Sequence, residues 1–167
     1  YARTEQWDEI IRHCHGPIKN YLYLTYLNRA LAEKGELADR MFAFDQHGPQ
    51  GLLASWNKTF TVSTLLSDAY FTLGEIALSQ EMAFEGYVTV IGAGNPRNLQ
   101  RLVQTNLIYG TYPIAEKYIS ILEKTYAYHD WAKRHRGFLY NDKAIEADPV
   151  LGPKRKALPK ESNLSGI

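Results

Sequence analysis

Apolar residues recur at helical spacing along most of the chain and predict an all-α fold. The clearest example runs from Leu99 to Thr125, where one apolar stripe ends at Gly110 and a second begins at Tyr112. Residues at i, i+3, i+4 and i+7 lie on one face of an α-helix, so each stripe predicts a helix with one buried face. Gly110 stands where the first helix must end with a positive φ, and Pro113 is tolerated in the first turn of the second helix. The segment therefore predicts an antiparallel pair of helices.

The same order of helix, turn and second helix occurs at two earlier places. The first copy has its turn at Gly35, and the middle copy has Leu73-Gly74 within its first helix and a turn at Leu78 to Glu81. Copies spaced by roughly 20 to 50 residues indicate stacked units of a repeat protein. We predict a helical repeat domain over residues 1–147, with a partial repeat over 1–16, repeats over about 18–50, 62–92 and 96–126, and a capping helix over about 128–140. Residues 148–167 are rich in proline and glycine and predict an extended tail.

These motifs resemble the tetratricopeptide repeat. That family places a leucine–glycine pair in the first helix, a turn glycine after it, and then an aromatic and a small residue. In the last copy Leu102, Gly110, Tyr112 and Ala115 match in register. The resemblance implies a solenoid of antiparallel helix hairpins. In the first copy Arg40 stands in place of the small residue, which predicts looser helix packing there.

The resemblance also implies a concave face, lined by the first helix of each hairpin. Its register projects three residues of each copy into that face. They are Thr25, Arg29, Glu33, Asp68, Phe71, Glu75, Arg97, Gln100 and Gln104. Polar positions flanked by apolar ones suit a peptide groove, and they also suit a solvated helix face.

Charge and candidate chemistry narrow the expected functions. The formal net charge of +1 gives no strong field, so we expect no nucleic-acid partner. His13-Cys14-His15 holds the only cysteine, and neighbours one and two apart on a helix point in different directions, so these side chains do not converge on one metal ion. Two basic clusters, at 133–136 and 154–156, suit either acidic lipids or partners, or a solvated surface. We expect no metal, no cofactor and no enzymatic activity.

A longer stretch resembles one particular protein family. Ala30 to Phe42, with Gly51-Leu-Leu53 and Thr105 to Gly110, is similar to the C-terminal region of a bacterial multi-pass membrane-protein family of unknown function. That resemblance implies that this chain is a fragment and meets a membrane only through an upstream segment that it does not contain. It contains no apolar run of about 18 residues, the length that a membrane-spanning helix needs.

Two functions follow from this reading. The first is a protein- or peptide-binding scaffold in the soluble part of a membrane-anchored bacterial protein. The alternative is an accessory domain of a membrane-embedded enzyme or transporter whose active site lies upstream. Buried Asp, Glu or His in upstream membrane helices would favour the alternative.

Overall fold

The computed structural model describes residues 1–55, 59–89 and 95–159. The α-helices in these ranges are α1 (Trp7–His13), α2 (Tyr21–Glu33), α3 (Leu37–Arg40), α4 (Phe60–Leu73), α5 (Ile76–Val88), α6 (Pro96–Tyr109), α7 (Tyr112–Glu123), α8 (His129–Arg136), α9 (Asp142–Ala147) and α10 (Leu151–Lys156). Three short 3₁₀ segments, η1 (Ala2–Thr4), η2 (Met41–Ala43) and η3 (Pro49–Gly51), join them. The described residues contain no β-strand, so the predicted all-α class is confirmed.

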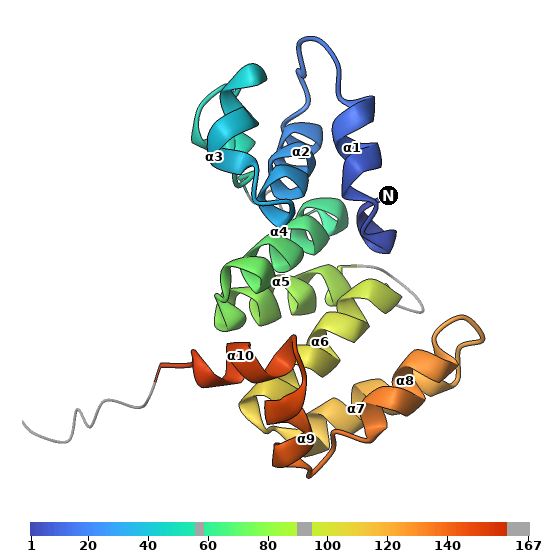
Figure 1. Ribbon diagram of the computed structural model, residues 1–167. Helices are drawn as coiled ribbons and strands as arrows, with labels where there is room; N and C mark the ends of the chain where they lie inside the picture. Colours follow the sequence, from blue (N-terminus) through green and yellow to red (C-terminus); the bar gives the residue numbers. More distant parts are fainter. Residues whose placement is uncertain (56–58, 90–94, 160–167) are drawn as a thin grey trace, which may run out of the picture.

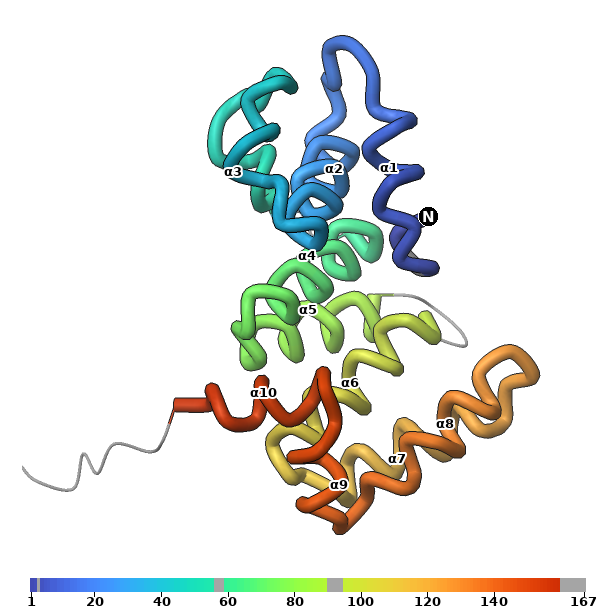
Figure 2. The backbone as a smooth tube through the Cα atoms, in the orientation of Figure 1, coloured from blue at the N-terminus to red at the C-terminus, as the bar shows by residue number. Residues whose placement is uncertain are grey.

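Most helices pack against their neighbours in sequence. The chief contacts are α1 with α2, α4 with α5, α5 with α6, α6 with α7, and α7 with α8. Figure 1 shows α1 to α3 at one end of the molecule, α4 and α5 in the middle, and α6 to α9 at the other end. The backbone trace in Figure 2 shows that α10 departs from this order, since it returns to contact α6. None of the helices in the described ranges combines the length and the apolar character needed to cross a bilayer.

The predicted turn at Gly110 is confirmed. Gly110 ends α6 with a φ of 75°, and the N–H of Thr111 donates to the carbonyl oxygen of Asn106 at 2.9 Å. Glycine adopts this left-handed conformation without the clash that a Cβ causes. The chain reverses here, and α7 then packs back against α6.

The predicted turn of the middle copy is wrong. Leu78 to Glu81 lie inside α5, and the chain reverses instead at Gly74, which has a φ of 86°. The N–H of Glu75 donates to the carbonyl oxygen of Tyr70 at 2.9 Å and closes the end of α4. Glycine suits both the crowded middle of a helix pair and the left-handed end of a helix, and Gly74 takes the second position.

The first copy has only a rudimentary second helix. The helix α3 comprises four residues, none of them buried, and it leads directly into η2. Arg40 is exposed and pairs with Glu36 one turn earlier. The charged end of Arg40 stays in water, and no residue of α3 is buried against a neighbouring helix.

The apolar core runs through the molecule as three clusters of buried side chains. One joins α1 and α2 around Leu24, Leu27 and Leu31, and one joins α4 and α5 around Leu66 and Met82. The largest extends from Phe71 at the end of α4 to α10 and contains the following fully buried side chains: Val103, Leu107, Ala115, Ile119, Leu122, Ala132 and Ile145. The stripes predicted for residues 99 to 122 therefore form the centre of the core.

The predicted extended tail is wrong for residues 151–156, which form α10. Leu151 is 2% exposed and belongs to the largest core cluster. Pro153 falls in the first turn of α10, where its missing N–H costs nothing. Gly152 lies close to the backbone of α9, because a Cβ there would stand 2.4 Å from the carbonyl oxygen of Glu146. Residues 160–167 of that predicted tail lie outside the described residues.

Gly152→Ala tests the docking of α10. The added methyl group meets backbone atoms of Glu146 and forces α9 and α10 apart, so we expect a loss of about 1–3 kcal/mol in unfolding free energy. Gly137→Ala is the matched control, since Gly137 has a φ of −64° and its nearest contact would be 3.3 Å away. We expect that control to stay within about 1 kcal/mol of the parent. Urea unfolding measures both, and equal midpoints for parent and Gly152→Ala would refute the packing described for α10.

Candidate functional site: a buried carboxylate and three arginines

Asp68 is a buried carboxylate in the middle of α4. Its side chain is 2% exposed, because the apolar residues around it on α4 pack against neighbouring helices. An isolated charge at such a position would cost several kcal/mol, so the carboxylate needs partners. Arginines from two other helices provide them.

Arg29 reaches Asp68 from α2, and Arg97 and Arg101 reach it from α6. Arg101 Nη2 donates to Asp68 Oδ1 at 2.8 Å. Arg29 Nη1 lies 3.2 Å from Asp68 Oδ2, and Arg97 pairs with the same oxygen. Arg97 and Arg101 are four residues apart, which places both on one face of α6. Asp68 therefore joins α2, α4 and α6 through one carboxylate.

The start of α6 fixes where Arg97 lies. Asn95 precedes the helix and its Oδ1 accepts the backbone N–H of Arg97 at 3.0 Å. Pro96 occupies the first helical position, where its fixed φ suits the helix. This cap holds the first turn of α6 against the carboxylate on α4.

Further contacts hold the other two arginines in place. The guanidinium carbon of Arg101 lies 3.6 Å from the centre of the Phe71 ring, and Arg101 Nη1 donates to Gln104 Oε1 at 3.0 Å. Arg29 lies over the ring of Trp7 at 5.2 Å and pairs with Glu33, whose Oε1 is 3.7 Å from Arg29 Nε. A guanidinium stacked on an aromatic ring loses little further freedom when it binds a ligand.

The electrostatics keep Asp68 ionised. Burial alone would raise the pKa of Asp68, but the positive charges of Arg101, Arg97 and Arg29 together hold it below its ordinary value. Burial lowers the pKa of the Arg101 guanidinium, and Asp68 opposes that change. Asp68 is therefore ionised at neutral pH.

A small polar cavity opens beside this cluster. Its volume is about 190 Å³, and it is lined by Ala2, Glu5, Arg29, Asp68, Arg97, Gln100, Arg101, Gln104 and Trp131. Three arginines and two carboxylates line it, so one positive charge is in excess. Two of the arginines that line it carry buried N–H groups, Arg101 Nε and Arg29 Nε among them, that make no hydrogen bond. The cavity thus presents more donors than the protein itself uses.

Most of the nine residues projected into a concave face gather here. Arg29, Asp68, Arg97, Gln100 and Gln104 line the cavity. Glu33 and Phe71 stand behind it, in contact with Arg29 and Arg101.

The other two lie elsewhere. Thr25 is buried and donates to the carbonyl oxygens of Tyr21 and Gln50. Glu75 is exposed at the turn between α4 and α5. The sequence analysis placed it on the concave face because it put the turn of that copy too late, at Leu78 to Glu81.

The sequence analysis missed four residues of the cavity, namely Ala2, Glu5, Arg101 and Trp131. Arg101 follows Arg97 by one helical turn, and that spacing alone places it on the same face of α6. Glu5 and Trp131 come from the first residues of the chain and from α8. No local sequence pattern predicts that Glu5 and Trp131 line the cavity, because only the tertiary packing brings them there.

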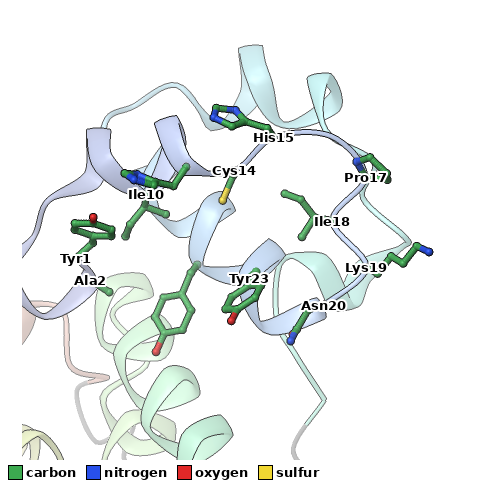
Figure 3. Close-up of a pocket in the computed structure, with 12 residues that line it drawn as sticks. Tyr1, Ala2, Ile10, Cys14, His15, Pro17, Ile18, Lys19, Asn20 and Tyr23 are labelled. Atoms are coloured by element: carbon green, nitrogen blue, oxygen red, sulfur yellow. The ribbon is translucent and has the colours of Figure 1, made fainter.

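A larger, mostly apolar cavity of about 690 Å³ lies between α1 and α2. Figure 3 shows Cys14 and Ile18 extending into it from the segment that joins the two helices, with Tyr23 on the far wall. Burial raises the pKa of the Cys14 thiol. Within the described residues no group of three or more His, Cys, Asp or Glu is placed to hold a metal ion. The charged cavity is the stronger candidate site, because its polar groups converge on one point.

Comparison with known proteins places the chain in a family without giving it an activity. Residues 1–166 match the model of a protein family described as Family of unknown function (DUF6057). No curated protein and no solved structure matches the chain.

Asp68→Asn tests whether the carboxylate organises the site. The amide keeps the shape but leaves three half-buried arginines without their shared, buried counter-charge, so we expect a loss of about 3–5 kcal/mol in unfolding free energy. Asp8→Asn is the control, because Asp8 is 80% exposed in its ion pair with Lys34. An exposed pair contributes about 0–1 kcal/mol, so the control should unfold almost as the parent does.

The same two proteins give a pH test. The pKa of Asp68 is lower in the folded state than its ordinary value of 3.8, so its stabilisation is fully present above that pH. As the pH falls below that value, the unfolded chain takes up the proton first and the stabilisation is lost. We expect the difference between parent and Asp68→Asn in urea unfolding to narrow as the pH falls below about 4. A difference that stays constant down to about pH 2 would contradict this account.

Proposed function

Because the chain belongs to the Family of unknown function (DUF6057), which assigns it no activity, we propose from its own site that it is a protein- or peptide-binding scaffold. One observation carries the proposal. Side chains from α2, α4 and α6 converge on one polar cavity, although the first and last of them, Arg29 and Gln104, are more than seventy positions apart along the chain. A surface built from several helices suits a ligand that extends across them.

The neutral side chains at the cavity suit a peptide backbone. Gln100 and Gln104 both line it and are half-buried. A glutamine amide has donors and an acceptor, which match the carbonyl and N–H groups of an extended peptide. Because the two glutamines are four residues apart on α6, both face the same ligand.

The state of the carboxylate supports binding over acid–base catalysis. A general base works best when its pKa lies near the working pH. The pKa of Asp68 is held low by three arginines, and its oxygens are already engaged by them. Asp68 thus serves to hold the arginines, and the arginines and glutamines are the groups left to meet a ligand.

We further propose that the pairs α4–α5 and α6–α7 are tetratricopeptide-like units. Each pair reverses at a glycine with positive φ, and each packs along its length. On this proposal α2, α4 and α6 are the first helices of successive units and share one face. Attachment to a membrane through an upstream segment stays a prediction of the resemblance.

Peptide selection tests the proposal. A phage-displayed library of random peptides is panned on the chain of residues 1–167, and enriched peptides are measured by fluorescence anisotropy. We expect Gln100→Ala to weaken their binding about three- to tenfold, the effect of losing one hydrogen bond to the ligand.

Gln80→Ala is the matched control. Gln80 lies on α5 in a different hollow, lined by Phe84 and Ile114, so its loss should leave the affinity unchanged. A library that yields no binding peptide, or peptides that bind Gln100→Ala as tightly as the parent, would overturn the proposed function.

A further inference from the structure

The arginine cluster offers donors that the protein leaves unused. A guanidinium carries five N–H donors, and an ionised carboxylate accepts about four hydrogen bonds. Asp68 is shared among three guanidinium groups. Arg101 Nε is buried without a hydrogen bond, and so are Arg29 Nε and Arg29 Nη1, although these two lie 3.7 Å and 3.2 Å from Glu33 Oε1 and Asp68 Oδ2 in ion pairs. Buried donors in folded proteins nearly always have a partner, so this deficit points to an acceptor supplied from outside.

The charge at the cavity fixes the charge of that acceptor. The lining carries one positive charge in excess. Beyond the lining, Glu33 pairs with Arg29, and the ammonium group of Lys154 lies over Phe71 at 4.7 Å, beside Arg101. These two outer charges offset each other. One added negative charge therefore neutralises the site, whereas a phosphate group of about −1.5 to −2 would leave it negative next to Asp68 and Glu5.

The size and depth of the cavity limit which chemical group of a ligand can bring the negative charge to the arginines. A volume of about 190 Å³ is below the roughly 300–1,000 Å³ of sites that enclose whole small molecules, so one end group of a longer ligand enters. The side chains of Arg29, Arg101 and Arg97 are only 11%, 13% and 22% exposed. Recessed guanidinium groups require a stem that reaches inward. Arg97, the most exposed of the three, meets the ligand first.

We propose that the cavity binds the side-chain carboxylate of a glutamate in a peptide ligand. The two methylene groups of glutamate give the reach, and its carboxylate matches the planar fork of a guanidinium in a bidentate pair. Trp131 and Ala2 line the same cavity and contact the methylene stem. This inference rests on the proposed function and names the chemical group that the scaffold recognises.

The test uses small probes that isolate the end group. Acetyl-glutamate amide carries the side-chain carboxylate, and acetyl-glutamine amide is its neutral counterpart of the same shape. The arginine Nε–H signals of the ¹⁵N-labelled chain are followed by NMR at constant ionic strength. We expect acetyl-glutamate amide to shift the signals of Arg97 and Arg101 in a saturable way, with a Kd on the order of 1–10 mM, and the glutamine probe to shift neither.

Variants separate the bidentate site from a general charge effect. Arg97→Gln should abolish the saturable shift, and Arg97→Lys should weaken it strongly, because an ammonium group lacks the planar fork. Arg40→Gln is the control, since Arg40 is a surface arginine paired with Glu36 and should leave the shift intact. Urea unfolding of each variant confirms that it is folded before the titration.

Two further probes distinguish other sources of negative charge. Acetyl-alanine presents a chain-terminal carboxylate, and inorganic phosphate presents a phosphate. Saturation by either one at a lower concentration than acetyl-glutamate amide would overturn the assignment to a glutamate side chain. Equal shifts with the glutamine probe, or no shift with acetyl-glutamate amide up to about 50 mM, would overturn the proposal of a carboxylate site.

The failure of this inference can be told apart from the failure of the proposed function. If the binding of selected peptides depends on Gln100 but acetyl-glutamate amide shifts no arginine signal, the proposed scaffold is supported and the carboxylate site is overturned. If acetyl-glutamate amide binds but the library yields no peptide, the cavity is a carboxylate site, and both the peptide scaffold and the assignment to a peptide's glutamate are overturned.

Discussion

The ionised carboxylate of Asp68 is the constraint on which the rest of the site depends. It joins three helices that belong to different parts of the sequence, because Arg29 of α2 and both Arg97 and Arg101 of α6 pair with it. A buried ion pair is a poor source of net stability, because the desolvation of each charge offsets most of the attraction. A core of apolar side chains would join these helices at least as firmly. The physical advantage of the charged cluster is that it holds three guanidinium groups in fixed positions near the surface.

Fixed positions matter because a ligand then binds a site that is already formed. Stacking on Phe71 and Trp7, pairing with Glu33, and the Asn95 cap of α6 restrict the arginines before any ligand arrives. Long side chains that are free in solution lose about 0.5–1.5 kcal/mol each when a ligand immobilises them. In this protein the fold already restricts the arginine side chains, so a ligand that binds them causes a smaller loss of conformational entropy. The same packing recesses the donors, so the ligand that we propose needs a group with enough reach.

Sequence reasoning predicted the class of fold and five of the residues that line the polar cavity, and its errors have physical causes. The stripe around Leu102 and Ile119 and the turn at Gly110 follow from local rules and were predicted, because helix periodicity and glycine conformation act over a few residues. Gly74 was misplaced because glycine suits both a crowded helix interior and a left-handed helix end, and only the packed chain decides between them. The helix α10 was missed because Leu151 becomes apolar core only when α9 and α6 are in place. Arg101 was within reach of a spacing argument, whereas Trp131 joins the cavity from α8 through tertiary packing alone.

The central claim is that Asp68 and its arginines act as one coupled unit, and a double-mutant cycle measures that coupling directly. The unfolding free energies of the parent, Asp68→Asn, Arg101→Gln and the double variant give the interaction between the two side chains. The account predicts that the two single losses are far from additive, with a favourable coupling of about 1–3 kcal/mol. A coupling within about 0.5 kcal/mol of zero would mean that Asp68 and Arg101 contribute independently, and that the carboxylate does not organise the site.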